Sequence, residues 1–181
     1  MKDKILETFP WITNWLKVEL PDYLVAETKE HKIMTEIKER WGRSDTKELL
    51  NDLKKKYGND ALKAMEMYID HNIRIDWKKM GIREGHRGTE MEDFFRVLWE
   101  PLKNEGFEYS IKKEGNKAEF CVTKCPFHEL AKMLEMQDWM FILSCSGDKA
   151  AGESFCNKIS FYRTKTLMEG NDCCNHQYYY K

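Results

Sequence analysis

Cysteine is confined to the last third of this 181-residue chain. Residues 1–120 contain no cysteine, and residues 121–181 contain six. Random placement would put all six there in about one or two chains in a thousand, so the clustering has a cause. Either buried strands accept the thiols as small hydrophobic residues, or the thiols form a reactive site. The six are Cys121, Cys125, Cys145, Cys156, Cys173 and Cys174.

Histidine and aspartate accompany several of these thiols. Cys174 and His176 are two residues apart in a predicted strand, and therefore share one face of it. Cys125 ends an earlier predicted strand, and Cys145 and Asp148 follow the helix that comes next. If the strands lie side by side, we expect thiol, imidazole and carboxylate groups to meet in one pocket.

Cys125 also directly precedes Pro126, where this helix is expected to begin. The amides at the start of a helix favour an anion, so they would lower the pKa of the Cys125 thiol. Cys121 is four residues earlier in the predicted strand. Strand alternation therefore predicts that Cys121 and Cys125 share a face.

Such a group of side chains permits two kinds of chemistry. Cys125, Cys145, Cys174 and His176 could hold a zinc-like divalent metal with an open position for water. Alternatively, a cysteine activated by His176 and oriented by Asp148 attacks an electrophilic carbon. The spacing C-x3-C-P-x-H matches neither a zinc finger nor a zinc deaminase signature.

Two cations are expected beside these residues. A two-residue turn at residues 169–170 would place Arg163 opposite His176 and Lys165 opposite Cys174, on one side of the sheet. Both could bind the carboxylate of a small anionic substrate, or Arg163 could form a structural ion pair. We expect this side to line a cavity, because burying three such groups without partners would cost several kcal/mol.

The elements that position these residues divide the chain into a helical region, 1–105, and a second region, 106–181. The first shows helical spacing of apolar residues, with a capping box at Thr89 and Glu92 and a kink or restart at Pro101. Its predicted helices cover residues 22–41, 45–57, 60–80 and 90–105. His86 lies in a connector that we expect to be a solvated loop.

The second region alternates in the manner of strands. A hairpin is expected around residues 107–122, a helix from Pro126, a loop at 147–152 and a second hairpin over 159–180. We therefore predict an α+β fold, in which a helical N-terminal half packs with a C-terminal antiparallel sheet built of two hairpins flanking a helix.

Charge and hydropathy exclude several classes of protein. Thirty basic residues face 31 acidic ones, for a net charge of −1, which is unlike a dedicated nucleic-acid binder. No apolar stretch approaches the roughly 18–20 residues of a membrane span, and no secretory signal opens the chain. We expect a cytoplasmic protein that binds neither nucleic acid nor membrane. If the cysteines are only core residues, the helical region could instead serve as a homodimer surface.

The last third of the chain carries a more specific pattern. It begins with Thr123-Lys-Cys-Pro126, continues with Cys145 and Asp148, and ends with Ile159-x-Phe-x-Arg-Thr-x-Thr-Leu-x-x-Gly-x-Asp-x-Cys-x-His176. With the helix that follows Tyr57, this pattern resembles the L-2-amino-thiazoline-4-carboxylic acid hydrolase-like family over roughly residues 57–181. The resemblance implies a hydrolase that opens a thiazoline-type cyclic C–N bond of a small anionic molecule.

A second, more distant similarity gives the alternative function. The terminal Gly-x-x-x-Cys-x-aromatic strand is similar to vinyl-reductase-like small-molecule-binding domains, although His176 stands where that pattern has an aromatic residue. Under this alternative the chain is a non-enzymatic sensor of a small molecule or a metal. Under the hydrolase hypothesis, Cys174, Cys145 or Cys125 is the ligand or nucleophile, His176 the acid–base group and Asp148 its orienting partner.

Overall fold

A computed structural model describes residues 3–85 and 89–181. Contacts divide the chain into two compact units, Met1–Ile69 and Asp70–Lys181, whereas the sequence placed its boundary near residue 105. His86 lies outside the described residues. Within the described ranges, no helix is long and apolar enough to cross a membrane.

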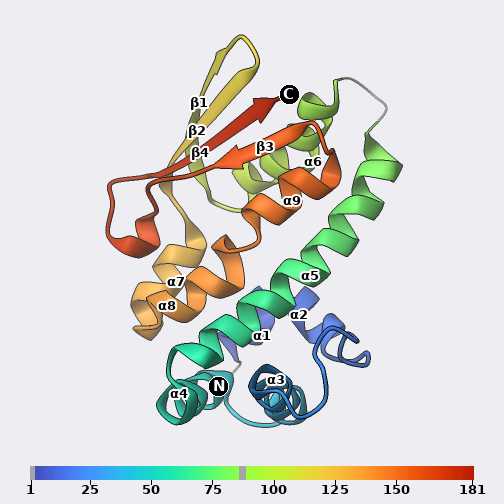
Figure 1. The fold of residues 1–181 in the computed structure, drawn as a ribbon. Helices are drawn as coiled ribbons and strands as arrows, with labels where there is room; N and C mark the ends of the chain where they lie inside the picture. Colours follow the sequence, from blue (N-terminus) through green and yellow to red (C-terminus); the bar gives the residue numbers. More distant parts are fainter. Residues whose placement is uncertain (1–2, 86–88) are drawn as a thin grey trace. The chain divides into compact units, whose positions relative to one another are not determined.

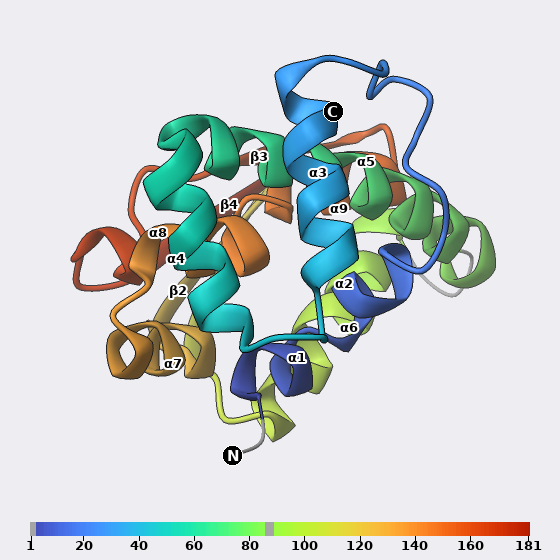
Figure 2. The same ribbon diagram turned by 90° about the horizontal axis from the view of Figure 1, so that it is seen from below.

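The first unit is helical and has its own apolar core. Figure 2 shows α3 and α4 side by side. Side-chain oxygens set where these two helices begin, because Thr28 accepts from the amide of His31 and Asp45 accepts from the amide of Glu48. The helices are α1 (Lys4–Thr8), α2 (Pro10–Trp15), α3 (Lys29–Arg40), α4 (Thr46–Tyr57) and the first part of α5 (Asn59–Glu84).

The second unit joins helices to one antiparallel sheet (Figure 1). Its strand order is β1-β2-β4-β3, so the two predicted hairpins lie side by side and the α+β expectation is confirmed. The strands are β1 (Glu108–Glu114), β2 (Lys117–Lys124), β3 (Ile159–Tyr162) and β4 (Cys174–Tyr180). The other elements are α6 (Glu90–Asn104), α7 (Pro126–Leu134), α8 (Gln137–Met140), the π-helical turn η1 (Phe141–Cys145), α9 (Asp148–Phe155) and the 3₁₀ turn η2 (Leu167–Glu169).

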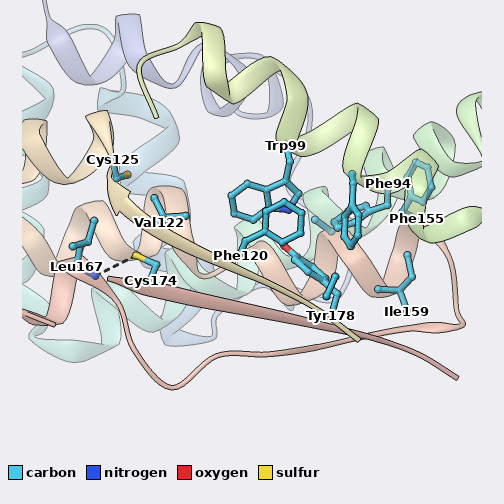
Figure 3. Close-up of a cluster of buried hydrophobic side chains, with 13 residues drawn as sticks. Phe94, Trp99, Phe120, Val122, Cys125, Phe155, Ile159, Leu167, Cys174 and Tyr178 are labelled. Carbon is cyan, nitrogen blue, oxygen red and sulfur yellow. Dashed lines mark hydrogen bonds between the residues drawn. The ribbon is translucent and has the colours of Figure 1, made fainter. Parts of the chain in front are cut away.

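Aromatic rings fill the core between this sheet and helices α6 and α9 (Figure 3). The rings of Trp99 and Phe120 stack with their centroids 4.2 Å apart, and Phe94 meets Tyr178 edge-on at 5.3 Å. Such pairs contribute about 0.5–1.5 kcal/mol beyond the area they bury. The core-facing side of β2 and β4 is therefore fixed by large rings.

Three helical expectations need correction. The segment 147–152, expected as a loop because of its glycines, begins α9 at Asp148. Gly147 precedes that helix, and Gly152 lies within it, close to the side chains of Ile159 and Tyr178 of the sheet. The helix expected from residue 22 begins only at Lys29, as α3. Helix α6 has its predicted capping box and continues past Pro101 to Asn104 without a restart.

A bulge changes the predicted alternation at the end of β2. Glu108 pairs with Lys124 and Tyr109 with Val122, so Thr123 is an extra residue on the β2 side. Cys125, beyond this bulge, is buried in the core, whereas Cys121 lies on the opposite face, alternating with buried Phe120 and Val122. The prediction that Cys121 and Cys125 share a face is therefore wrong.

Close packing of α5 against the end of α9 generates a stability prediction. A Cβ added at Gly81 would lie 2.1 Å from the backbone oxygen of Phe155. Although alanine favours helices by about 1 kcal/mol over glycine, we expect Gly81→Ala to lower the free energy of unfolding by about 1–3 kcal/mol in urea titrations. Lys79→Ala, at an exposed position of the same helix, is the matched control and should change it by less than about 0.5 kcal/mol. A Gly81→Ala protein as stable as the wild type would contradict the close approach.

Candidate active site

Three charged or polar side chains from separate elements meet at the end of the β3–β4 pair. The ladder pairs Phe161 with Tyr178 and Tyr162 with Gln177. Continuing that register by one residue brings Arg163 opposite His176, as the sequence predicted, and Arg163 Nη1 lies 3.3 Å from His176 Nε2. His176 Nε2 also lies 3.2 Å from Oδ2 of Asp148, the first residue of α9.

A buried ion pair is the centre of this group. Arg163 Nη1 donates to Asp148 Oδ2, and Arg163 Nη2 donates to the backbone oxygen of Cys145 at 3.2 Å. The Arg163 side chain is only 9% exposed and that of Asp148 is 21% exposed. Burial alone would raise the pKa of Asp148, but the charge of Arg163 and the hydrogen bond with His176 outweigh it, so this pKa lies below its ordinary value. Asp148 is therefore an anion at neutral pH.

Aromatic rings enclose the guanidinium and the imidazole. Arg163 Cζ lies 5.6 Å from the ring centroids of both Phe141 and Phe161, within the range of cation–π attraction. The ring of Trp99 meets His176 edge-on at 5.0 Å. These rings exclude water, which strengthens the ion pair and holds the imidazole in place.

One nitrogen of His176 has two partners and the other has none. Nε2 lies near Oδ2 of Asp148, which can only accept, and near Nη1 of Arg163, which can only donate. Nδ1 is buried and has no hydrogen-bond partner within the described part of the chain. In the tautomer that donates from Nε2 to Asp148, Nδ1 bears a lone pair and is a base next to a fixed carboxylate.

Three of the candidate cysteines near Asp148, Arg163 and His176 are neutral thiols. Burial raises the pKa of Cys125 to about 11 even though the amides of His128 and Phe127 act to lower it, so the expected effect of the helix start is outweighed. Burial also raises the pKa of Cys145 and of Cys174. The charge of Asp148 adds to each of these shifts, which places all three thiols within its field.

Cys174 has a structural contact in addition. Its sulfur accepts a hydrogen bond from the amide of Leu167 at 3.2 Å, shown as a dashed line in Figure 3. This contact ties the start of β4 to the 3₁₀ turn that precedes it. Cys174 and Cys125 both belong to the buried apolar cluster.

The residues present do not fit the predicted zinc-like site. Over residues 3–85 and 89–181, no three His, Cys, Asp or Glu side chains are grouped so that they could hold a metal ion. Cys125, Cys145, Cys174 and His176 therefore do not form the expected ligand set. The cation that Asp148 and His176 face is the guanidinium of Arg163.

The chain between β3 and β4 departs from the expected two-residue turn. Residues 163–173 form a longer loop that contains η2, and Asn175 Oδ1 accepts from the amides of Thr164 and Lys165. The amide of Asn175 donates to the Lys165 carbonyl, so Lys165 lies opposite Asn175 and not Cys174. The Lys165 side chain is half exposed and pairs with Asp172. The predicted contact of Lys165 with Cys174 is therefore wrong by one residue.

A cavity was expected on this face because Arg163 and His176 would otherwise be buried without partners. Asp148 is the partner of both, so these charges do not require a cavity. A cavity of about 480 Å³ lies instead between α6 and the β1–β2 hairpin, and Trp99 belongs both to its wall and to the surroundings of His176. Phe120, which also lines it, is the cross-strand partner of His176. Two cations stand at its rim, Lys103 over the ring of Tyr109 and Lys113 over that of Phe95.

Sequence reasoning identified the polar residues of the group but missed the rings around it. Phe141 and Trp99 lie in segments that were predicted only as helices, and Phe161 in one predicted only as a strand. One usable signal was present, since Phe161 precedes Arg163 by two residues in a strand and must share its face. The π-helical turn that carries Phe141 has no comparable signal in the sequence.

Comparison with known proteins gives one result. The sequence matches the L-2-amino-thiazoline-4-carboxylic acid hydrolase family over residues 22–178, so the similarity extends further toward the N-terminus than the motifs alone indicated. The match includes Asp148, Arg163 and His176 together with the elements that position them. No curated protein matches the chain.

The ion pair generates a prediction with a defined pH dependence. Arg163→Met leaves the Asp148 carboxylate buried without its countercharge, so we expect the free energy of unfolding at pH 7 to fall by about 3 kcal/mol. Lys165→Met, which removes the exposed pair with Asp172, should cost less than about 1 kcal/mol.

Acidification should bring the stabilities of the wild type and of Arg163→Met closer together. In the wild type the lowered pKa of Asp148 stabilises the fold at pH values above 3.8, the ordinary pKa of an aspartate. This contribution is lost as the pH falls through the lowered pKa. Without Arg163, burial raises the pKa of Asp148. Protonation of Asp148 as the pH falls from 7 toward 4 should therefore remove the unpaired charge and reduce the destabilisation of the variant. The stability difference should narrow in urea titrations over this range, and a constant difference would contradict the pairing.

Proposed function

Because the chain belongs to the L-2-amino-thiazoline-4-carboxylic acid hydrolase family, we propose that it is a small-molecule hydrolase. Its substrate class is a small anionic heterocycle with a cyclic amidine or amide, of the thiazoline-carboxylate type. The reaction opens a ring C–N bond with water. The observation that carries this proposal is the imidazole of His176, held through Nε2 by Asp148 with Nδ1 left unpartnered among the described residues.

The proposed steps follow from this orientation. Nδ1 of His176 takes a proton from a water molecule as its oxygen bonds to the amidine carbon, and the imidazolium so formed is stabilised by Asp148. On this addition the π electron pair of the C=N bond moves to the ring nitrogen, which takes the proton from the imidazolium. Nδ1 then takes the second proton from the new hydroxyl group as the C=O bond forms, the C–N bond breaks with its electron pair going to the ring nitrogen, and the imidazolium gives that proton to the nitrogen. Arg163 keeps Asp148 ionised and fixed while the charge on the imidazole changes.

Activated water is favoured over a cysteine nucleophile. A thiolate is the reactive form of cysteine, and burial raises the pKa of Cys125, Cys145 and Cys174. At neutral pH these groups are thiols, which line the site. His176, Asp148 and Arg163 are therefore the residues to which we assign the chemistry.

The cavity beside Trp99 is the place where we expect the substrate to bind. Its aromatic wall suits a flat ring, and Lys103 and Lys113 suit a carboxylate, in a lining that also holds the carboxyl groups of Glu92, Asp93 and Glu100. Arg163 and Lys165, the cations expected from the sequence to hold the substrate, are engaged with Asp148 and Asp172. Since Trp99 also contacts His176, movement of its ring would connect the cavity with Nδ1.

The catalytic assignment predicts a specific loss of activity. When the wild type is assayed with a panel of thiazoline and related cyclic amidine acids, we expect it to open the ring of at least one of them. Chromatography and mass spectrometry of the product measure this reaction. His176→Gln should lower kcat by about 10²–10⁴-fold, the usual contribution of a general base. Cys156→Ser, a half-buried position outside the site, is the matched control and should leave turnover unchanged.

Two outcomes would contradict this function. Turnover that survives His176→Gln would remove His176 from the mechanism. Binding of a panel compound without hydrolysis by the wild type, seen as a rise in Tm, would favour the sensor alternative.

The binding assignment makes a separate prediction. The double variant Lys103→Ala and Lys113→Ala should raise KM by about tenfold with little change in kcat. The reason is that both lysines attract the substrate carboxylate equally in the bound ground state and in the transition state. Lys112→Ala, on the same strand as Lys113, is the control because alternate strand residues face opposite sides. An unchanged KM in steady-state kinetics would place the substrate elsewhere.

A further inference from the structure

Two cysteines that the proposed reaction does not use lie close together. Cys121 of β2 pairs across the ladder with Asn175 of β4, and Cys173 comes directly before β4, two residues before Asn175. Cys121 is half-buried and Cys173 is buried. The register therefore brings the two thiols to neighbouring segments at the end of the β2–β4 pair.

The two thiols interact directly. The proximity of the Cys121 thiol, followed by burial, raises the pKa of Cys173 to about 11. Lys165 acts in the opposite direction on Cys173, because a nearby cation favours a thiolate.

The remaining cysteines are held differently. Cys174 follows Cys173 directly, but its side chain turns to the buried face and its sulfur accepts from the Leu167 amide. Cys156 is half-buried after α9, where its sulfur accepts from the amide of Lys158 at 3.5 Å. Outside the site, Cys121 and Cys173 are thus cysteines whose thiols influence one another directly.

We propose that Cys121 and Cys173 form a dithiol modification site that reacts with a low-molecular-weight disulfide, such as glutathione disulfide, to give a cross-strand disulfide between β2 and the residue before β4. Cys121, the more accessible thiol, attacks first as its thiolate: one sulfur–sulfur bond forms, that of the reagent breaks, and one glutathione leaves. Cys173 then attacks the Cys121 sulfur of this mixed disulfide, and the second glutathione leaves. The protein loses two protons and two electrons, which the two glutathione molecules carry away.

The position of the pair makes the second step feasible. Cys173 lies at the end of the 163–173 loop and just before β4, so its backbone can move without breaking the ladder that holds His176. A disulfide requires closer approach of the sulfurs than a hydrogen bond does. The loop can supply this movement, whereas Cys125 and Cys174 belong to the packed apolar cluster.

Peptide mapping tests the proposal independently of catalysis. Reduced full-length protein is incubated with glutathione disulfide, its remaining thiols are blocked with N-ethylmaleimide, and tryptic peptides are identified by mass spectrometry. We expect peptide 118–124, which holds Cys121, to become linked to peptide 166–181, which holds Cys173 and Cys174. Dithiothreitol should release both.

Variants distinguish the cysteines. The linked pair should be absent from Cys121→Ser and from Cys173→Ser, and Cys173→Ser should instead accumulate the glutathione adduct on Cys121. Cys156→Ser is the matched control and should give the wild-type yield within about twofold. Circular dichroism shows whether each variant is folded. Persistence of the link in folded Cys173→Ser, or a wild-type protein that carries only a glutathione adduct or no modification, would overturn the proposal.

Discussion

The buried ion pair between Arg163 and Asp148 is the interaction on which the proposed site depends. It joins the residue after β3 to the first residue of α9, and through Arg163 Nη2 it also holds the end of the π-helical turn. His176 of β4 binds the same carboxylate. A carboxylate in these surroundings is stable as an anion only because the guanidinium is present. Four segments are thus fixed by one pair of charges.

The part of the site that depends on strand alternation could be predicted from the sequence. Period-two spacing placed Cys174, His176 and Tyr178 on one side of β4, and the pairing of the hairpin placed Arg163 opposite His176, as observed. This succeeded because a one-residue slip would turn every large ring of the strand away from the core. Beyond Arg163 the ladder ends and Asn175 binds the loop backbone, so the prediction failed at Lys165.

The rest depends on long-range packing that local patterns do not contain. The sequence shows which cations lie on one face of the sheet. It does not show that Asp148 begins a helix, because the neighbouring glycines predicted a loop there. A cavity was therefore expected where the structure has an ion pair. The bulge at Thr123 reversed the sides of Cys121 and Cys125. The raised pKa of Cys125 likewise comes from burial by distant elements.

The central claim is that Asp148 holds the proton of His176 on Nε2 and leaves Nδ1 as the base. Long-range proton–nitrogen NMR spectra of protein labelled with ¹⁵N-histidine report the tautomer directly, and the signals of His176 are those absent from His176→Gln. For the neutral imidazole we expect a protonated Nε2 and an unprotonated Nδ1, with this preference lost in Asp148→Asn. A proton on Nδ1, with Nε2 accepting from Arg163, would contradict the account.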